Sequence, residues 1–191
     1  MQTRCTWSAN SFEEYVRYHD EEWGVPVHDD KTHFEFLVLE SAQAGLSWAT
    51  ILKKREGYRK AFADFDYKVV SEFGEGMVEE LLQDAAIIRN RMKIEATINN
   101  AKRFIEVQKE FGSFDKYSWQ FVDGKPIINS WKTMEEVPVT TKESDAFAKD
   151  LKKRGFKFLG STTVYAHMQA IGMVNDHTID CFRYNELLGA I

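Results

Sequence analysis

The only two cysteines of the chain lie near its opposite ends, and each has a histidine close by. Cys5 is followed after thirteen residues by His19, and His177 is followed after three by Cys181. If residues 177–181 are helical, His177 and Cys181 share one helix face, and the four side chains could form a tetrahedral Cys2His2 zinc site. Closing such a site would join the two ends of the chain, so the metal would act on folding stability rather than on chemistry.

Two other interpretations of these cysteines remain open. They could be buried thiols whose neighbouring histidines are coincidental, or they could form a disulfide. Cytoplasmic proteins rarely contain disulfides, and the first residues lack the basic and apolar segments of a secretory signal. We therefore expect a cytoplasmic or nucleoid-associated protein, in which a disulfide is the less favoured interpretation.

Helix signals dominate between the two ends. N-cap residues begin many of the predicted helices, namely Asp30, Ser47, Asp66, Asn90 and Ser113. Apolar spacing predicts the longer helices over residues 30–43, 47–63, 75–84, 90–111, 142–154 and 162–171. Residues 123–138 are the least regular part, and alternating strand patterns are nearly absent. The prediction is an all-α fold in a single domain, residues 1–191, which could consist of two closely packed helical lobes.

Composition limits the function classes. Of the 191 residues 43% are hydrophobic and 29% are charged, and no apolar run is long enough to span a membrane. A net charge of −5 argues weakly against a nucleic-acid partner, which usually requires a basic surface. Three stretches are nevertheless basic and could bind phosphate or be solvated helix faces: Lys53, Lys54, Arg55, Arg59 and Lys60; Arg89, Arg91 and Lys93; and Lys152, Lys153, Arg154 and Lys157.

Glu40 is the most unusual side chain within the predicted helices, because it shares a face with Phe36 and Leu37 in an apolar run. A carboxylate there would be desolvated, and its pKa would rise unless it finds a partner. The alternatives are that Glu40 extends to the rim of the core or pairs with a lysine.

Aromatic residues before and after this helix could converge on Glu40, namely Tyr15, Tyr18, Trp23 and Trp48. An aromatic slot with one carboxylate suits a flat, electron-poor or cationic heterocycle, through stacking, cation–π attraction and hydrogen bonding. Each of these aromatic residues could instead be part of the core.

Strings of residues follow one another along the chain in a specific order: Tyr18-His19-Asp20, Glu22-Trp23-Gly24-Val25-Pro26, Leu39-Glu40, Gln43-Ala44-Gly45-Leu46-Ser47-Trp48, Ile51-Leu52-Lys53-Lys54-Arg55, Ile87-Ile88-Arg89-Asn90-Arg91, Lys152-Lys153-Arg154-Gly155-Phe156-Lys157-Phe158 and Val174-Asn175-Asp176-His177. Together they closely resemble the bacterial 3-methyladenine DNA glycosylase I family. The resemblance extends from Cys5 to Cys181, which is nearly the whole chain.

The resemblance implies a helix-hairpin-helix superfamily fold and removal of 3-methyladenine from alkylated DNA. It also implies one structural Zn2+ ion in a clasp that joins the termini, with Cys5, His19, His177 and Cys181 as its ligands. We expect a monomer that acts on double-stranded DNA.

The resemblance further implies roles around the pocket. The glutamate matching Glu40 hydrogen-bonds the extruded base, and the tryptophan matching Trp48 stacks on it. Three further positions line the pocket, namely Tyr15, Tyr18 and Trp23. Two others match residues that probe or fill the gap left in the duplex, namely Gln43 and Leu46.

The hairpin is expected over residues 156–163, where Lys157, Gly160, Ser161 and Thr162 would contact DNA. Such a hairpin directs backbone N–H groups and a helix N-terminus at a phosphate, which gives affinity without sequence information. Superfamily members that also cleave the backbone have a lysine two residues after the last glycine of the hairpin, where this chain has Thr162. We therefore expect a monofunctional glycosylase without lyase activity.

Many relatives of the superfamily also use an aspartate further along the chain to stabilise the sugar cation. Asp176 and Asp180 are the nearest candidates by count, but both fall in the expected metal-ligand helix and a direct role is not favoured. The family also often has glycines where this chain has Ala86 and Met92, which could alter local packing outside the pocket.

The expected chemistry needs little acid catalysis, because N3-methylation makes adenine cationic and lets it leave as a neutral base. The enzyme would flip the nucleotide, select the lesion and admit water to C1′. The main alternative is a catalytically silent module that binds damaged DNA with the same fold. A shift to another lesion such as 7-methylguanine is a weaker alternative.

Overall fold

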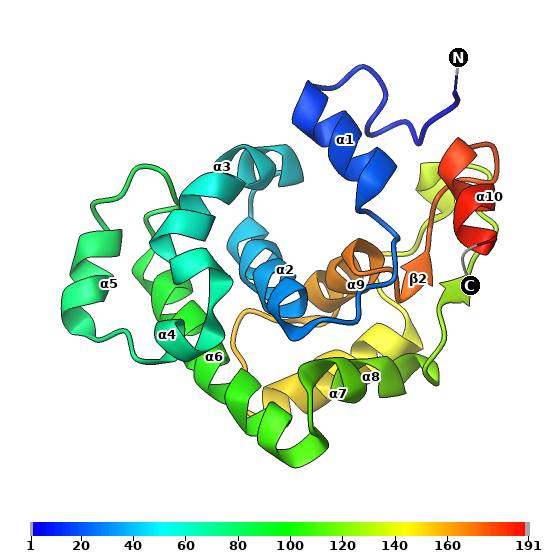
Figure 1. The fold of residues 1–191 in the computed structure, drawn as a ribbon. Helices are drawn as coiled ribbons and strands as arrows, with labels where there is room; N and C mark the ends of the chain where they lie inside the picture. Colours follow the sequence, from blue (N-terminus) through cyan, green and yellow to red (C-terminus); the bar gives the residue numbers. More distant parts are fainter. Residues whose placement is uncertain (1, 190–191) are drawn as a thin grey trace.

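The helix α2 (Asp30–Gln43) runs through the middle of the molecule, and its apolar run from Phe34 to Leu39 is buried there (Figure 1). Its residues from His33 to Ala42 are all buried, as expected for a helix that is hydrophobic all round. The helices α3 (Trp48–Ala61), α6 (Arg91–Phe111), α7 (Phe114–Trp119) and α9 (Ser161–Ala170) pack against it. The computed structural model describes residues 2–189, to which the structural statements below refer.

The remaining elements surround this centre. The other α-helices are α1 (Glu13–Glu21), α4 (Tyr67–Ser71), α5 (Glu75–Leu81), α8 (Lys142–Lys153) and α10 (Phe182–Leu188), and three short 3-10 helices are η1 (Ala63–Phe65), η2 (Gln120–Val122) and η3 (Met134–Glu136). The all-α prediction is confirmed. None of the described helices combines the length and the apolar character needed to cross a membrane.

Most of the expected helix starts are confirmed by their capping hydrogen bonds. The side chains of Ser47, Asp66, Asn90 and Ser113 each accept a backbone N–H in the first turn of the helix that follows. The prediction for Asp30 is wrong by one residue, because Asp29 caps α2. The predicted helices also extended too far at residues 63 and 84, since α3 ends at Ala61 and α5 ends at Leu81.

Asp30 does not cap α2 but forms hydrogen bonds with residues of other helices. Its carboxylate accepts the backbone N–H groups of Phe114 and Asp115 at 3.0 and 2.9 Å and the side-chain amide of Gln108 at 2.5 Å. It therefore links the beginning of α2 to the junction between α6 and α7.

The irregular segment contains the one secondary-structure pairing that the sequence did not indicate. The strand β1 (Ile127–Ile128) pairs in parallel with β2 (Val174–Asn175), and Ile127 lies opposite Val174. Just beyond β2, the N–H of Ile179 donates to the carbonyl of Trp131 at 2.9 Å. These bonds place the segment after residue 123 against the C-terminal part of the chain.

The expected helix over residues 177–181 is wrong. These residues form a turn, and α10 begins only after Cys181, whose backbone is extended. The physical reason is that backbone groups in this stretch bond to other partners: the N–H of His177 donates to the side chain of Asn175, and that of Ile179 to Trp131.

The residue Ala86 is accommodated by a glycine on a neighbouring helix. A Cβ atom at Gly57 in α3 would lie 2.3 Å from the carbonyl oxygen of Ala86 and 2.8 Å from its Cβ. Only glycine allows the two segments to approach this closely. Met92 is 63% exposed, so its side chain is not part of the core.

Candidate functional site: an aromatic pocket and a Cys2His2 cluster

A cavity of about 200 Å³ opens between the N-terminal helices and α9. It is lined by residues from α1, α2, α3, α9, η3 and the segments before and after α1: Trp7, Tyr15, Tyr18, Trp23, Glu40, Gln43, Trp48, Met134, Ala166 and Gln169. Pockets for drug-sized ligands occupy roughly 300–1,000 Å³, so this cavity suits a smaller molecule. The five residues expected at the pocket from the Glu40 and aromatic argument all lie here.

The walls of the pocket are aromatic rings in mutual contact. The centroid of Trp48 lies 5.4 Å from that of Tyr18, and the centroid of Trp7 lies 5.1 Å from those of both Tyr15 and Trp23. Aromatic pairs at such separations support one another in tilted or edge-to-face arrangements. The result is a rigid slot that favours a flat ligand.

The Glu40 carboxyl is the acidic group of this slot. Its residue is 4% exposed, and it takes part in no ion pair among the described residues, so neither the rim position nor the lysine pair occurs. Burial raises its pKa from 4.5 to about 8, because the charged form loses its hydration. Burial and the nearby Glu40 also raise the pKa of the Tyr18 hydroxyl.

Two buried polar atoms of the pocket have no hydrogen-bond partner among the described residues, namely Oε2 of Glu40 and Nε1 of Trp48. One is an acceptor when ionised and the other is a donor. Unsatisfied buried groups cost free energy, so a ligand that offers both a donor and an acceptor would be stabilised here.

The turn between α2 and α3 carries the two residues expected to face the duplex. Gln43 lines the pocket, whereas Leu46 lies outside it and is 40% exposed. Gly45 has a φ of 78°, a conformation that L side chains rarely adopt. The turn therefore presents an apolar side chain to solvent beside the pocket mouth.

Four pocket residues were missed from the sequence: Trp7, Met134, Ala166 and Gln169. Trp7 follows Cys5 by two residues, so convergence of the termini could have indicated it. Ala166 and Gln169 are spaced for one face of α9, the helix after the expected hairpin. Met134 lies in the irregular segment, where no local pattern indicates its position.

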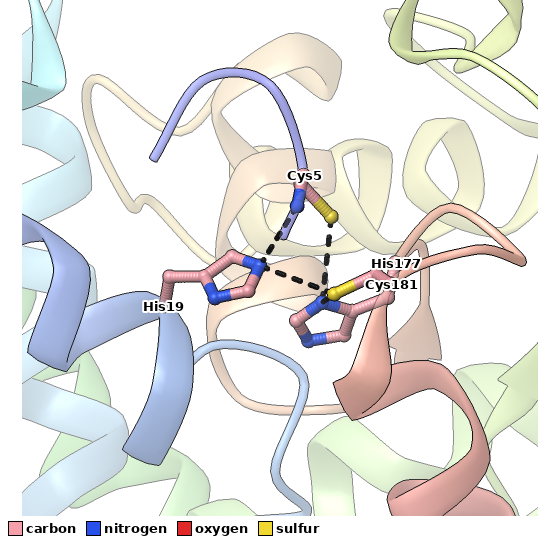
Figure 2. Close-up of side chains that lie close together, drawn as sticks. All are labelled: Cys5, His19, His177 and Cys181. Atoms are coloured by element: carbon pink, nitrogen blue, oxygen red, sulfur yellow. Dashed lines mark hydrogen bonds between the residues drawn. The ribbon is translucent and has the colours of Figure 1, made fainter. Parts of the chain in front are cut away.

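The four terminal Cys and His residues converge, although the helical spacing expected for two of them is absent. Their ligand atoms all lie within 4.8 Å of one another and all four residues are buried. Nδ1 of His177 is 3.5 Å from each sulfur, and Nε2 of His19 is 3.5 Å from Sγ of Cys181 (Figure 2). The cysteines are free thiols. The cluster could hold a metal ion.

The outward nitrogens of both histidines are held by other groups. Nδ1 of His19 lies 2.8 Å from the carboxylate of Asp20, which Arg4 also contacts, and Nε2 of His177 donates to the carbonyl of Trp23 at 2.9 Å. These contacts orient each ring so that its other nitrogen faces the sulfurs, the arrangement that metal-binding histidines commonly have. The cluster also adjoins the pocket, because Trp23, whose carbonyl holds His177, lines the pocket.

The segment expected to be a DNA-binding hairpin joins α8 to α9. A groove of about 620 Å³ runs along it, lined in part by Lys149, Lys152, Lys157, Gly160 and Ser161. Nothing lies within 4 Å of a Cβ built at Gly160, and no side chain caps α9. The first N–H groups of α9 therefore face an open space.

Other residues of this segment are held from inside the protein. The side chain of Asn100 bonds to both the N–H and the carbonyl of Lys157, at 2.8 and 2.9 Å. The hydroxyl of Ser161 donates to Asp145 at 2.5 Å, whereas Thr162 is exposed.

The structure divides the three basic stretches. In the first two, arginines are engaged in ion pairs: Arg55 with Glu22 and Glu35, and Arg91 with Glu75, Glu79 and Glu95. In the third, Arg154 pairs with Asp150 and Glu110, but the lysines are exposed and unpaired among the described residues, namely Lys152, Lys153 and Lys157. The third stretch thus has three exposed lysines without an ion pair among the described residues, and the first has two, Lys53 and Lys60.

Asp176 has no free acceptor position. Its two oxygens accept four hydrogen bonds at 2.6–2.8 Å, from the side chains of Asn129, Trp131, Tyr165 and Gln169. A carboxylate has about four such positions. Asp180 lies at the surface in the turn before α10, because the expected ligand helix is absent.

The comparisons with known proteins are consistent over nearly the whole chain. A family model described as methyladenine glycosylase matches residues 7–184. The chain is similar to DNA-3-methyladenine glycosylase 1 of Escherichia coli K12, with 48% identity over 181 residues, or 95% of this chain and 96% of that protein. The DNA-3-methyladenine glycosylase of Haemophilus influenzae is 45% identical over 95% of this chain and 97% of its own length.

Solved structures of such enzymes superpose closely on this one. A crystal structure of a 3-methyladenine DNA glycosylase I gives a TM-score of 0.91 at 48% identity, covering 94% of this chain and 98% of its own. The structure of the Staphylococcus aureus 3-methyladenine DNA glycosylase I, which concerns recognition of 3-methyladenine, gives 0.90 at 37% identity, covering 94% and 95%.

Replacing Glu40 with glutamine should change how stability depends on pH. Because the pKa of Glu40 is raised by burial, the folded protein retains a proton that the unfolded chain releases, and wild-type stability falls as pH rises from about 5 to about 8. The Glu40→Gln variant lacks this titration. In urea titrations followed by tryptophan fluorescence, it should match the wild type near pH 5 and exceed it near pH 8 by up to about 4 kcal/mol.

The matched control is Glu80→Gln, which makes the same substitution at an exposed site on α5. It should leave the pH dependence of the wild type unchanged. A stability difference for Glu40→Gln that is equal at both pH values would contradict a protonated, desolvated Glu40.

Proposed function

Because the chain belongs to the methyladenine glycosylase family, we propose that it excises 3-methyladenine from alkylated DNA by hydrolysing the N-glycosidic bond. The observation that carries this proposal is Glu40, a buried carboxyl group with an unpartnered oxygen in an aromatic slot. The slot is small enough to select one heterocycle, and its acidic group distinguishes a cationic base from a neutral one.

Trp48 and Glu40 recognise the base in different ways, by stacking and by hydrogen bonding. The Trp48 ring stacks on the flipped base, and the Tyr15, Tyr18 and Trp23 rings close the slot around it. Oε2 of Glu40 accepts a hydrogen bond from the base. A cationic purine favours the ionised carboxylate electrostatically, whereas unmodified adenine offers no charge to offset the desolvation.

The chemistry follows from the charge of the lesion. The bond from C1′ to a cationic base is already weak, and the base leaves as a neutral molecule, so binding and flipping are the main tasks of the protein. Water then attacks C1′ of an oxocarbenium-like sugar. Thr162 stands where lyase-competent relatives of the superfamily have a lysine, which supports a monofunctional enzyme.

The hairpin between α8 and α9 is the proposed phosphate site, in the manner of a helix-hairpin-helix. The open N-terminus of α9 offers N–H groups, with Gly160, Ser161 and Thr162 contributing backbone. Lys157 and its exposed neighbours supply local positive charge, which lets an acidic protein bind double-stranded DNA. The Ser161 hydroxyl is engaged by Asp145, so its backbone N–H is the better donor.

We propose one glycosylase domain that acts as a monomer, with two helical lobes and the pocket between them. Tyr15, Tyr18 and Trp48 reach the pocket from the N-terminal helices, and Ala166 and Gln169 reach it from α9. Gln43 probes the duplex and Leu46 fills the gap beside the flipped nucleotide. An enzyme that acts on chromosomal DNA would work in the cytoplasm, in association with the nucleoid.

The Cys2His2 cluster is the proposed site of one structural zinc ion. In a tetrahedral site with Zn–S of about 2.3 Å and Zn–N of about 2.1 Å, the ligand atoms lie about 3.5–3.8 Å apart. Three of the four sulfur–nitrogen pairs lie at 3.5 Å, which fits this arrangement, and all ligand atoms lie within 4.8 Å of one another. The interaction between the two thiols lowers the pKa of Cys181 and raises that of Cys5, so they share a proton that metal binding would displace, since a thiolate is the form that binds metal. Zinc would hold the ends of the chain together.

Metal analysis tests the zinc proposal. Purified protein should contain about one zinc ion per chain, and Cys181→Ser should lose most of it and unfold at lower temperature. The control is His167→Gln, which alters a buried histidine outside the cluster and should retain zinc. Zinc-free wild-type protein from a chelator-free preparation would refute the clasp.

Excision assays test the proposed function directly. The wild type should release free 3-methyladenine from methylated duplex DNA without strand cleavage. Glu40→Gln should slow release roughly hundredfold or more, because an interaction aimed at the lesion is lost. Glu80→Gln should match the wild type. If the folded wild type binds methylated DNA but releases no base even at high concentration, the silent binding module is the better account.

A further inference from the structure

Lys93 reaches from α6 to the end of α2. Its ammonium group donates to the carbonyl of Ala42 at 2.8 Å and to that of Ala44 at 2.7 Å. The side chain makes no ion pair among the described residues and is half-buried, and desolvation lowers its pKa. Both hydrogen bonds are charge-assisted and therefore stronger than neutral ones.

The Ala42 carbonyl belongs to the last turn of α2, and the Ala44 carbonyl belongs to the residue that ends the helix. The last carbonyls of a helix have no N–H partner within it, and a cation at that end also interacts favourably with the helix dipole. Ala44 leaves the helical conformation, with a φ of −45° and a ψ of 115°. The turn then closes through the N–H of Leu46, which donates to the carbonyl of Gln43 at 2.6 Å.

We propose that Lys93 is a positioning residue that fixes the turn bearing Gln43 and Leu46 against the DNA duplex, and that it is not a phosphate contact. This inference rests on the proposed function, which assigns these two residues to the gap beside the flipped nucleotide. The amine is directed at main-chain oxygens inside the protein, and Arg91 of the same basic stretch is likewise engaged, by three glutamates.

The pocket itself is held by other contacts. Arg55 on α3 pairs with Glu35 on α2 at 2.8 Å and with Glu22 at 2.8 Å, and Arg59 pairs with Glu35 at 2.9 Å. Ser47 caps α3 directly before Trp48. Loss of the Lys93 amine should therefore loosen the turn while α2 and α3 keep Glu40 and Trp48 in place.

The test compares Lys93→Met with Lys102→Met, which removes an exposed lysine from the same helix. Lys93→Met should slow single-turnover excision from duplex DNA roughly ten- to hundredfold, because small displacements of positioning groups have effects of this size. Because Gln43 also lines the pocket, the affinity of Lys93→Met for free 3-methyladenine should fall by much less than its excision rate. The salt dependence of duplex binding should equal that of the wild type. Lys102→Met should match the wild type in every measurement.

A measurement independent of activity accompanies these assays. Amide hydrogen exchange at residues 43–47 should be faster in Lys93→Met and unchanged in Lys102→Met. Lys93→Arg keeps a charged donor and should restore most of the excision rate. Lys93→Gln replaces the methionine variant if that variant does not fold.

Several results would overturn the inference. If Lys93 contacted a phosphate, Lys93→Met would bind the duplex more weakly, and the slope of log affinity against log salt would fall by about one. If Lys93→Met lost as much affinity for free 3-methyladenine as it loses in excision rate, Lys93 would support the whole pocket and not the turn alone. Unchanged excision and exchange would mean that it has no positioning role. Absence of excision by the wild type would instead refute the proposed function. The exchange data would then still show whether Lys93 restrains residues 43–47.

Discussion

Because α2 is apolar on nearly every side, it is stable only when other helices cover all of its faces, and much of the fold follows from that requirement. The helices α3, α6, α7 and α9 meet around it, and they come from distant parts of the chain. The same burial that stabilises Phe36 and Leu37 removes water from Glu40, one turn further on. Desolvation makes the ionised form of Glu40 unfavourable, and a cationic ligand in the pocket can offset that cost, so burial favours binding of a cation.

The Cys2His2 cluster and the pocket depend on one another through shared segments. His19 follows Tyr18 of the pocket wall, the carbonyl of Trp23 fixes the ring of His177, and Cys5 lies two residues before Trp7. Convergence of the two ends therefore places three aromatic walls around Glu40. On the far side, Asp176 next to His177 holds Gln169, another pocket residue, with a hydrogen bond of 2.8 Å. The contacts that bring the chain ends together therefore also position the walls of the slot.

Local signals explain how much of this could be predicted. Ser47, Asn90 and Ser113 cap their helices because a side-chain oxygen next to free N–H groups is a local interaction, and the burial of Glu40 follows from its helical neighbours. The β1–β2 pairing, the turn at residues 177–181 and the place of Met134 depend on partners far along the chain. The basic stretches were equally ambiguous, because Glu35 and Glu75, which neutralise Arg55 and Arg91, are distant in sequence.

The central claim is that the slot around Glu40 and Trp48 recognises the methylated purine and rejects unmodified adenine. The most direct test is the affinity of the purified protein for the free bases, measured by quenching of tryptophan fluorescence, since Trp48 forms a wall of the slot and four further indole or phenol rings line it. The account predicts saturable quenching by 3-methyladenine and much weaker quenching by adenine at the same concentrations. Equal binding of the two bases, or no binding of 3-methyladenine, would contradict it.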